Sequence, residues 1–236
     1  MSDTLNLHIL KDLIPAGLDY GTNLLAEFQP DSIWYETSLA VAADAIKQGI
    51  KTEYHSFQHT QEEIRRSLAN LGVDAQRTER NHSLTIIDDY TVQTGLSATS
   101  RSLKIADWSI EIAQKMKSGA ADDEVGRNWL HVDDNASILT RYNPENVVVD
   151  WFRTRAIPVT KTLQRIAISG LLTGVGSDAF YNHVESLYDG IIDFKTEEKD
   201  GEIAQFLRVR IMRGKSFDSR WHRLGQLDDG QVTLTT

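Results

Sequence analysis

Short apolar runs alternate with longer amphipathic segments along the chain. Runs rich in β-branched and other apolar residues predict buried strands at residues 22–27, 51–57, 83–88, 129–133 and 166–173. Apolar residues at helical spacing predict helices at residues 37–48, 60–70, 104–117, 146–155 and 161–165. Strands that alternate with helices are typical of a mostly parallel sheet covered by helices. The pattern therefore predicts an α/β fold.

Local signals mark several element ends. Thr60, followed three residues later by Glu63, fits a capping box at the start of the second helix. Gly49 is placed to end the first helix, and Pro158 is expected to interrupt or restart the helix around it.

The last quarter of the chain has a different pattern. Residues 174–186 contain two glycines and are predicted to form a loop, whereas residues 190–195 and 205–212 predict an antiparallel hairpin, followed by a strand at 231–234. Neither an internal repeat nor a low-complexity linker divides the sequence. We therefore expect a single domain over residues 1–236.

Composition excludes several classes of protein. The 236 residues contain no Cys, so cysteine nucleophiles, zinc fingers, iron–sulfur clusters and disulfide scaffolds are ruled out. With 25 Lys and Arg against 34 Asp and Glu, the net charge is −9, which disfavours binding to nucleic acid or to anionic membranes. Apolar runs are short and the first ten residues lack a signal pattern, so we expect a cytoplasmic protein without a membrane segment.

Several short segments, taken together and in order, resemble a RecA-type ATPase core of the KaiC-like branch. They are residues 11–17, 57–64 with 71–74, 131–137, 187–193 and 210–215. The resemblance covers nearly the whole chain. It implies a RecA-like, mostly parallel central sheet flanked by helices, with a C-terminal antiparallel hairpin. It also implies a Walker B-like strand that ends in Asp133 and Asp134, with Asp134 the better match.

The segment of this chain that aligns with the family's phosphate-binding loop does not match the sequence pattern of that loop. Such a loop needs G-x-x-x-x-G-K-[ST], because glycines let backbone amides surround the phosphates while Lys neutralises their charge. Counting back from Gly49 puts these positions on Phe28, Ile33, Trp34 and Tyr35, none of which matches. No Lys or Arg lies between Lys11 and Lys47, although six acidic residues do, so a polyphosphate would be repelled. We expect the bulky side chains to fill the nucleotide space.

The catalytic pair of the family is also altered. Where the family has an acidic pair that polarises the attacking water, this chain has Gln58 and His59. Gln can orient a water but cannot accept its proton, and His59 would have no bound phosphate to serve. We therefore expect no catalytic residue and no cofactor.

Asp133 and Asp134 allow two interpretations. A carboxylate at this position either holds magnesium or ends a strand by accepting hydrogen bonds from turn amides. The second is favoured, since magnesium in such sites is held largely with substrate phosphates. A further set, His55, His59 and His131 with Asp133, would suit a metal if the strands brought them together, but the spacing matches no metal motif and no metal is expected.

Basic residues gather on the late hairpin, among them Arg210, Arg213 and Lys215. The resemblance implies a retained contact with a neighbouring subunit. The alternatives are a nucleic-acid backbone or solvation of a strand edge.

The favoured function is a non-hydrolysing KaiC/RecA-like domain, a regulatory or scaffolding subunit that acts through protein–protein contacts. Its partner would be a second copy or a ring of active relatives. One alternative is an ATP-binding or ATPase protein with a noncanonical site that uses Asp134, Gln58 and a neighbour's residues 213–215. A third is a nucleic-acid-binding accessory protein that uses the basic hairpin.

Overall fold

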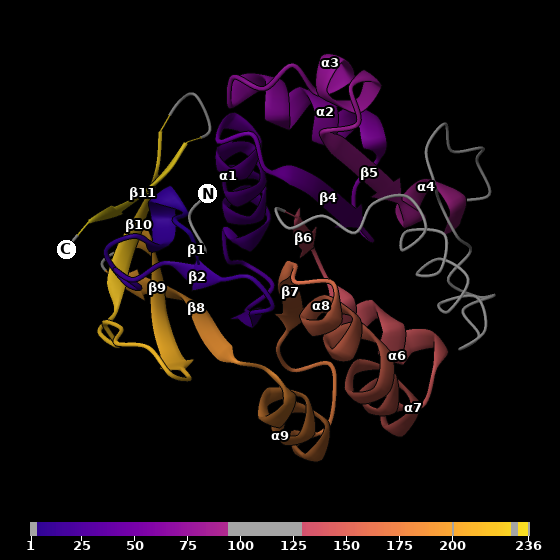
Figure 1. Cartoon of the computed structure of the whole chain (residues 1–236). Coiled ribbons are helices and arrows are strands. Elements are labelled where there is room, and N and C mark those ends of the chain that lie inside the picture. Colours follow the sequence, from indigo (N-terminus) through magenta and orange to yellow (C-terminus); the bar gives the residue numbers. More distant parts are fainter. Residues whose placement is uncertain (1–3, 94–128, 200, 228–230, 236) are drawn as a thin grey trace.

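A nine-stranded sheet with helices on both faces forms the centre of the molecule (Figure 1). The computed structural model describes residues 4–93, 129–199, 201–227 and 231–235. The helix predicted at residues 104–117 lies outside this range. The sheet strands are β3 (Asn23–Phe28), β4 (Lys51–Ser56), β5 (Leu84–Asp88), β6 (Trp129–Asp133), β7 (Ile166–Leu172), β8 (Gly190–Lys199), β9 (Glu202–Met212), β10 (His222–Gln226) and β11 (Val232–Thr235).

The strand order is β11-β10-β9-β8-β3-β7-β6-β4-β5. From β8 to β5 all neighbours are parallel, and from β8 to β11 they are antiparallel. This confirms the α/β class and the antiparallel C-terminal hairpin. Strand β3 lies near the middle, and all six of its residues are buried, as expected for a strand covered on both faces.

Helices α1, α2 and α3 cover one face of the sheet, and α6 to α9 cover the other (Figure 1). Their bounds, with that of the short α4, are α1 (Trp34–Lys47), α2 (Gln61–Asn70), α3 (Ala75–Arg80), α4 (Asp89–Gln93), α6 (Leu139–Tyr142), α7 (Glu145–Trp151), α8 (Ile157–Thr162) and α9 (Asp178–Leu187). Short 3-10 turns lie at His8–Leu10 and Ala136–Ile138. Among the described residues, no helix is long and apolar enough to cross a membrane.

Two hydrophobic core clusters lie on opposite faces of the sheet, each formed with different helices. On the α1 face, Leu24, Val132 and Ile168 belong to the cluster that also holds the buried residues of α1. On the other face, Leu25 and Leu171 belong to the cluster with Phe152 of the α7–α8 segment and with Phe180 and Val184 of α9. Burial of these side chains supplies most of the driving force for folding.

The segment at residues 4–19 covers the antiparallel strands on the α1 face. It contains the short strands β1 (Thr4–Leu5) and β2 (Leu18–Asp19), which pair antiparallel. Leu13 lies in the same core cluster as Leu207 and Leu224, and the backbone N–H of Asp218 donates to the Leu13 carbonyl over 2.9 Å.

Helix α9 corrects the prediction of a loop at residues 174–186. The glycines that suggested a loop precede the helix, and the Ser177 hydroxyl caps it by accepting from the Phe180 backbone N–H over 3.1 Å. Phe180 and Val184, one turn apart, then anchor the helix in the core.

The region around Pro158 agrees with a restarted helix, whereas the hairpin differs in its bounds. The chain stays helical through α7 and α8, because a π turn at Phe152–Ala156 leaves Pro158 in the first turn of α8, where its missing N–H costs little. Strands β8 and β9 are longer than predicted, and β10 was not predicted at all.

Candidate functional site

The carboxyl ends of β3, β4, β6 and β7 meet at one edge of the sheet, which is where ligands bind in open α/β sheets. Here residues 29–33, which we call the β3–α1 loop, connect β3 to α1. Phe28 ends the strand, Ile33 is the N-cap of the helix, and Trp34 and Tyr35 are its first two residues. The four residues aligned with the phosphate-loop pattern thus flank a genuine strand-to-helix turn.

The side chain of Trp34 is buried at this turn, with 3% of the residue exposed. Its indole Nε1 donates to the Asp134 carbonyl over 2.8 Å, and its ring lies 6.1 Å from the ring of Phe28 and 5.3 Å from that of Phe194. A Cβ on Gly170 would lie only 2.4 Å from this Nε1, so glycine is required beneath the indole. Trp34 therefore occupies space between β3, β6, β7 and β8.

The β3–α1 loop is bound by the C-terminal hairpin. The Gln205 carboxamide of β9 accepts from the Ile33 backbone N–H over 3.3 Å and donates to the Asp31 carbonyl over 2.9 Å. On β8, the Thr196 backbone N–H donates to the Gln29 side chain over 3.0 Å. The Ile33 backbone N–H is thus hydrogen-bonded within the chain. In a phosphate-binding loop, such an amide would point toward the ligand. Sequence reasoning missed Gln205 because it is 172 residues from Ile33.

Asp134 is almost fully buried, and its carboxylate binds the turn that follows β4. It accepts from the Phe57 backbone N–H over 2.8 Å and from the Ser56 hydroxyl over 2.6 Å. Burial raises the pKa of Asp134 to about 6, although these two hydrogen bonds act in the opposite direction. Asp133 accepts from the Gly170 backbone N–H over 3.2 Å. Asp134 thus binds the end of β4, and Asp133 binds a backbone amide within β7.

The altered pair Gln58 and His59 lies in the same turn. The His59 ring stacks on Tyr35 with 3.6 Å between centroids, and its backbone N–H donates to the Ser56 hydroxyl over 3.0 Å. Burial lowers the pKa of His59 and raises that of Tyr35 to about 12, so both rings are uncharged at neutral pH. Gln58 is exposed.

Two of the three histidines considered as metal ligands, His55 and His131, form ion pairs. His55 Nε2 lies 2.6 Å from Asp89 Oδ2, and His131 Nδ1 lies 2.8 Å from Glu53 Oε1. Burial acts to lower the pKa of His131, but hydrogen bonds to Asp133 and Glu53 outweigh it and raise the value to about 9.

A protonated imidazole cannot bind a metal. Within the described ranges, no three His, Asp or Glu side chains are arranged to hold a metal ion. Sequence reasoning missed Glu53, because its position opposite His131 depends on the pairing of β4 with β6.

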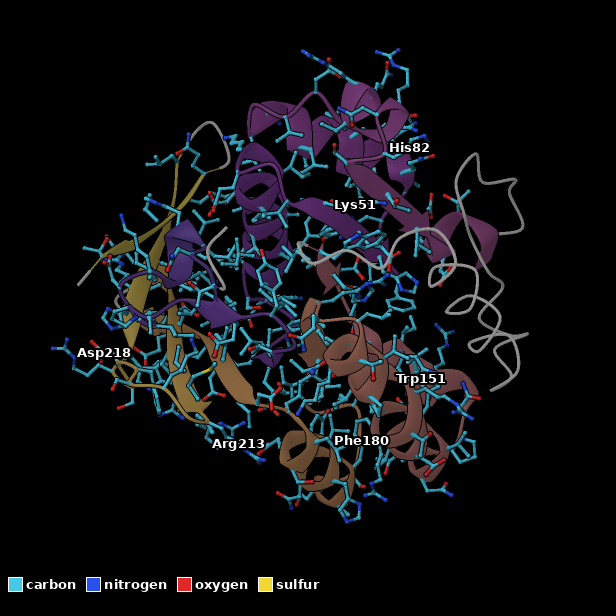
Figure 2. The ribbon with its side chains drawn as sticks, in the orientation of Figure 1. Lys51, His82, Trp151, Phe180, Arg213 and Asp218 are labelled. Carbon is cyan, nitrogen blue, oxygen red and sulfur yellow. The ribbon has the colours of Figure 1, made fainter. Side chains whose placement is uncertain are left out.

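The basic hairpin residues have partners in their own chain. Lys215 Nζ lies 2.8 Å from Asp19 Oδ1, and Arg210 Nη2 lies 2.6 Å from Glu27 Oε2. Arg213 donates to the Ser186 carbonyl over 3.2 Å at the end of α9, beside which Figure 2 labels it. Sequence reasoning had not placed Glu27 among the functional residues.

Comparison with known proteins identifies the family of the chain and its fold. The sequence model of the family described as "ATPase: KaiC" matches residues 39–232. The UPF0273 protein MJ1359 of Methanocaldococcus jannaschii is 24% identical over 174 residues, which cover 72% of this chain and 69% of that protein.

A solved structure shares the fold. It is the crystal structure of the KaiC-like protein PH0186 from Pyrococcus horikoshii, which superposes with a TM-score of 0.74 at 14% identity and covers 99% of both chains. The match to the family model extends from within α1 to the first residue of β11. The chain therefore belongs to the KaiC ATPase family.

Proposed function

We propose that this KaiC-family chain does not hydrolyse ATP and acts as a regulatory or scaffolding subunit through contacts with other proteins. The observation that carries the proposal is the burial of Trp34 at the strand-to-helix turn, with its indole N–H on the Asp134 carbonyl. In an ATPase of this superfamily the equivalent turn receives the phosphates.

The β3–α1 loop offers little to a nucleotide. It has no glycine to open its backbone and no Lys to neutralise phosphate, and it contains the acidic Asp31. The Ile33 amide and the Asp31 carbonyl are both taken by Gln205. Phosphate binding would therefore have to break existing hydrogen bonds and meet a negative charge without a compensating cation.

The groups expected to assist hydrolysis are engaged elsewhere. Asp134 holds the turn after β4 through Ser56 and Phe57, and His59 packs on Tyr35. A general base must reach the proton that it removes, and both side chains are engaged in these contacts within the chain. Under this proposal the chain acts by assembling with a second copy or with active relatives.

Calorimetric titration with ATP and magnesium tests the proposal. We expect no binding at micromolar ligand, while a functional P-loop ATPase titrated in the same buffer gives the positive control. Thermal unfolding of the same sample, with and without nucleotide, provides an independent measurement, because a ligand bound by the native state raises Tm. Micromolar affinity in either measurement would overturn the proposal.

One observation favours a second candidate, an ATPase with a noncanonical site. Asp134 keeps the position of a Walker B carboxylate at the end of β6. If the chain hydrolyses ATP, Asp134→Asn should abolish turnover while Asp150→Asn, on an exposed position of α7, should leave it unchanged. The nucleic-acid alternative has less support, since Arg210 and Lys215 are ion-paired within the chain.

A further inference from the structure

A group of charged side chains joins four elements on the α9 face of the sheet. Its members, which we call the Glu27 cluster, are Glu27 on β3, Asp193 on β8, Arg208 and Arg210 on β9, and Glu185 on α9. Glu27 is the register partner of Asp193, and Asp193 is the partner of Arg208. Arg210 lies at a β-bulge, where the extra residue directs its side chain toward β3.

Arg210 contacts all three carboxylates. Its Nη2 lies 2.6 Å from Glu27 Oε2 and 3.2 Å from Glu185 Oε1, and its Nε lies 3.1 Å from Asp193 Oδ1. Arg208 Nε lies 2.8 Å from the other oxygen of Asp193. Asp193 is thus held by two guanidinium groups, whereas Glu27 and Glu185 share one.

The charges of the cluster do not balance when every carboxyl group is ionised. Three carboxylates then face two guanidinium groups, which leaves one excess negative charge. Only 10% of the Glu27 side chain is exposed, and its Oε1 has no hydrogen-bond partner among the described residues. On its other side, β3 pairs with β7, where the register partner of Glu27 is the uncharged Leu171. A proton on Glu27 makes the cluster neutral.

The raised pKa of Glu27 agrees with the charge balance, which requires one bound proton. Burial raises it to about 8, with further increases from Glu185 and Asp193, while Arg210 acts to lower it. At neutral pH the geometry and the pKa both place the proton on the least exposed of the three carboxyl groups.

We propose that Glu27 is the proton-binding residue of an ionic latch that fastens α9 and the β8–β9 hairpin to β3. With the proton bound, Arg210 bridges Glu185 and Asp193 without competition. Loss of the proton adds a negative charge beside Glu185, whose side chain is the most exposed carboxylate of the cluster at 23% and lies on a helix of ten residues. The contact that weakens first is therefore that of α9. This inference does not depend on whether the chain binds a nucleotide.

Hydrogen exchange of the amides in residues 178–187, measured between pH 6.5 and 9.5 and corrected for intrinsic exchange rates, tests the latch. In the wild-type protein we expect protection of α9 to fall at least threefold as pH rises through about 8. Glu27→Gln, which mimics the protonated form, should remove this dependence. Glu198→Gln, at an exposed position of β8, is the matched control and should behave as wild type. Equal pH responses in Glu27→Gln and wild type, or no response in wild type, would overturn the proposal.

A second measurement covers the case in which Glu27→Gln does not fold. Carboxyl ¹³C NMR of the wild-type protein reports the ionisation of Glu27 directly. Ionisation well above the ordinary Glu value, shifted downward by Glu185→Gln, supports the latch. Ionisation at the ordinary value, or no effect of Glu185→Gln, contradicts it.

Discussion

Two strand-to-helix turns at the same end of the sheet, in contact where Tyr35 stacks on His59, start their helices in different ways. The start of α2 is capped locally, since Thr60 and Glu63 form a reciprocal capping box, although Asp134 also binds the preceding turn through Ser56 and Phe57. The turn from β3 to α1 has no side-chain cap at Ile33, and its polar groups are bound by Gln205 and Thr196, far along the chain. A helix start can thus be specified by its own residues or by distant ones, and only the first kind can be recognised in a sequence.

The largest expected effect is at Trp34. Trp34→Ala should lower the free energy of unfolding by about 3–5 kcal/mol, because the substitution removes a buried indole and leaves a cavity. Denaturant unfolding measures this loss. The control is Trp221→Ala, since Trp221 is only partly buried and contacts Lys195 and Arg208 through its ring. Equal costs at the two positions would show that the β3–α1 turn does not depend on Trp34.

A pH dependence is expected at Asp134. Its pKa is raised in the folded protein to about 6, so the folded state holds this proton more tightly than the unfolded state does. The resulting stability is complete below the ordinary pKa of 3.8 and is lost as pH rises through about 6. Asp134→Asn should remove this component, which we place on the order of 2 kcal/mol. Denaturant unfolding at pH 4 and pH 7 measures it, and an unchanged difference between the two pH values would contradict the assignment.

Gln205→Ala should have a smaller effect, of about 1–2 kcal/mol, because it leaves the Ile33 amide without a partner and leaves the Asp31 carbonyl only the Thr196 hydroxyl as a donor. Faster amide exchange in residues 29–33 should accompany it. Gln76→Ala, at an exposed position of α3, serves as the control and should leave both quantities unchanged. If Gln205→Ala protein bound ATP where wild type does not, Gln205 would be the principal obstacle to the nucleotide, ahead of Trp34.

The smallest effect is expected at the local turn. Thr60→Ala should cost about 1 kcal/mol, because it removes the hydroxyl that accepts from the Glu63 backbone N–H. Thr60→Ser retains the cap and should recover most of the stability in the same unfolding measurement. A loss of order limited to α2 would strengthen the contrast between the two turns. A loss of order in the β3–α1 loop would instead show that the two turns are coupled.

Prediction from the sequence succeeded for features specified by nearby residues and failed for those specified by distant ones. Strand β6 and the start of α2 agree with their predicted bounds, since apolar patterning and capping are encoded within a few residues. Helix α1 starts three residues before its predicted start, at Trp34 instead of 37, because nothing local marks the true one. The prediction that the residues of the β3–α1 turn are bulky and lack a phosphate cradle needed only the sequence, but the contacts of Gln205 needed the fold.

Polar pairs across strands were the least accessible to prediction. Glu53 and His131 are 78 residues apart, and Glu27 and Arg210 are 183 apart. Each pair depends on which strands are neighbours and on their register, and a single sequence does not contain that information. The role suggested for Arg210 at a subunit contact therefore stays a prediction beside its observed pairing with Glu27.

The segment at residues 4–19 bears on how the chain folds. Its Asp19 pairs with Lys215, which is 196 residues downstream, and its Leu13 carbonyl accepts from the Asp218 amide. On the ribosome, this early segment cannot reach its native position until the late strands have been synthesised. Its contacts with Leu207, Leu224 and Lys215 can therefore form only after the end of the chain has been synthesised, whereas its hydrogen bond from the His8 amide to Asp44 of α1 joins residues that are synthesised early.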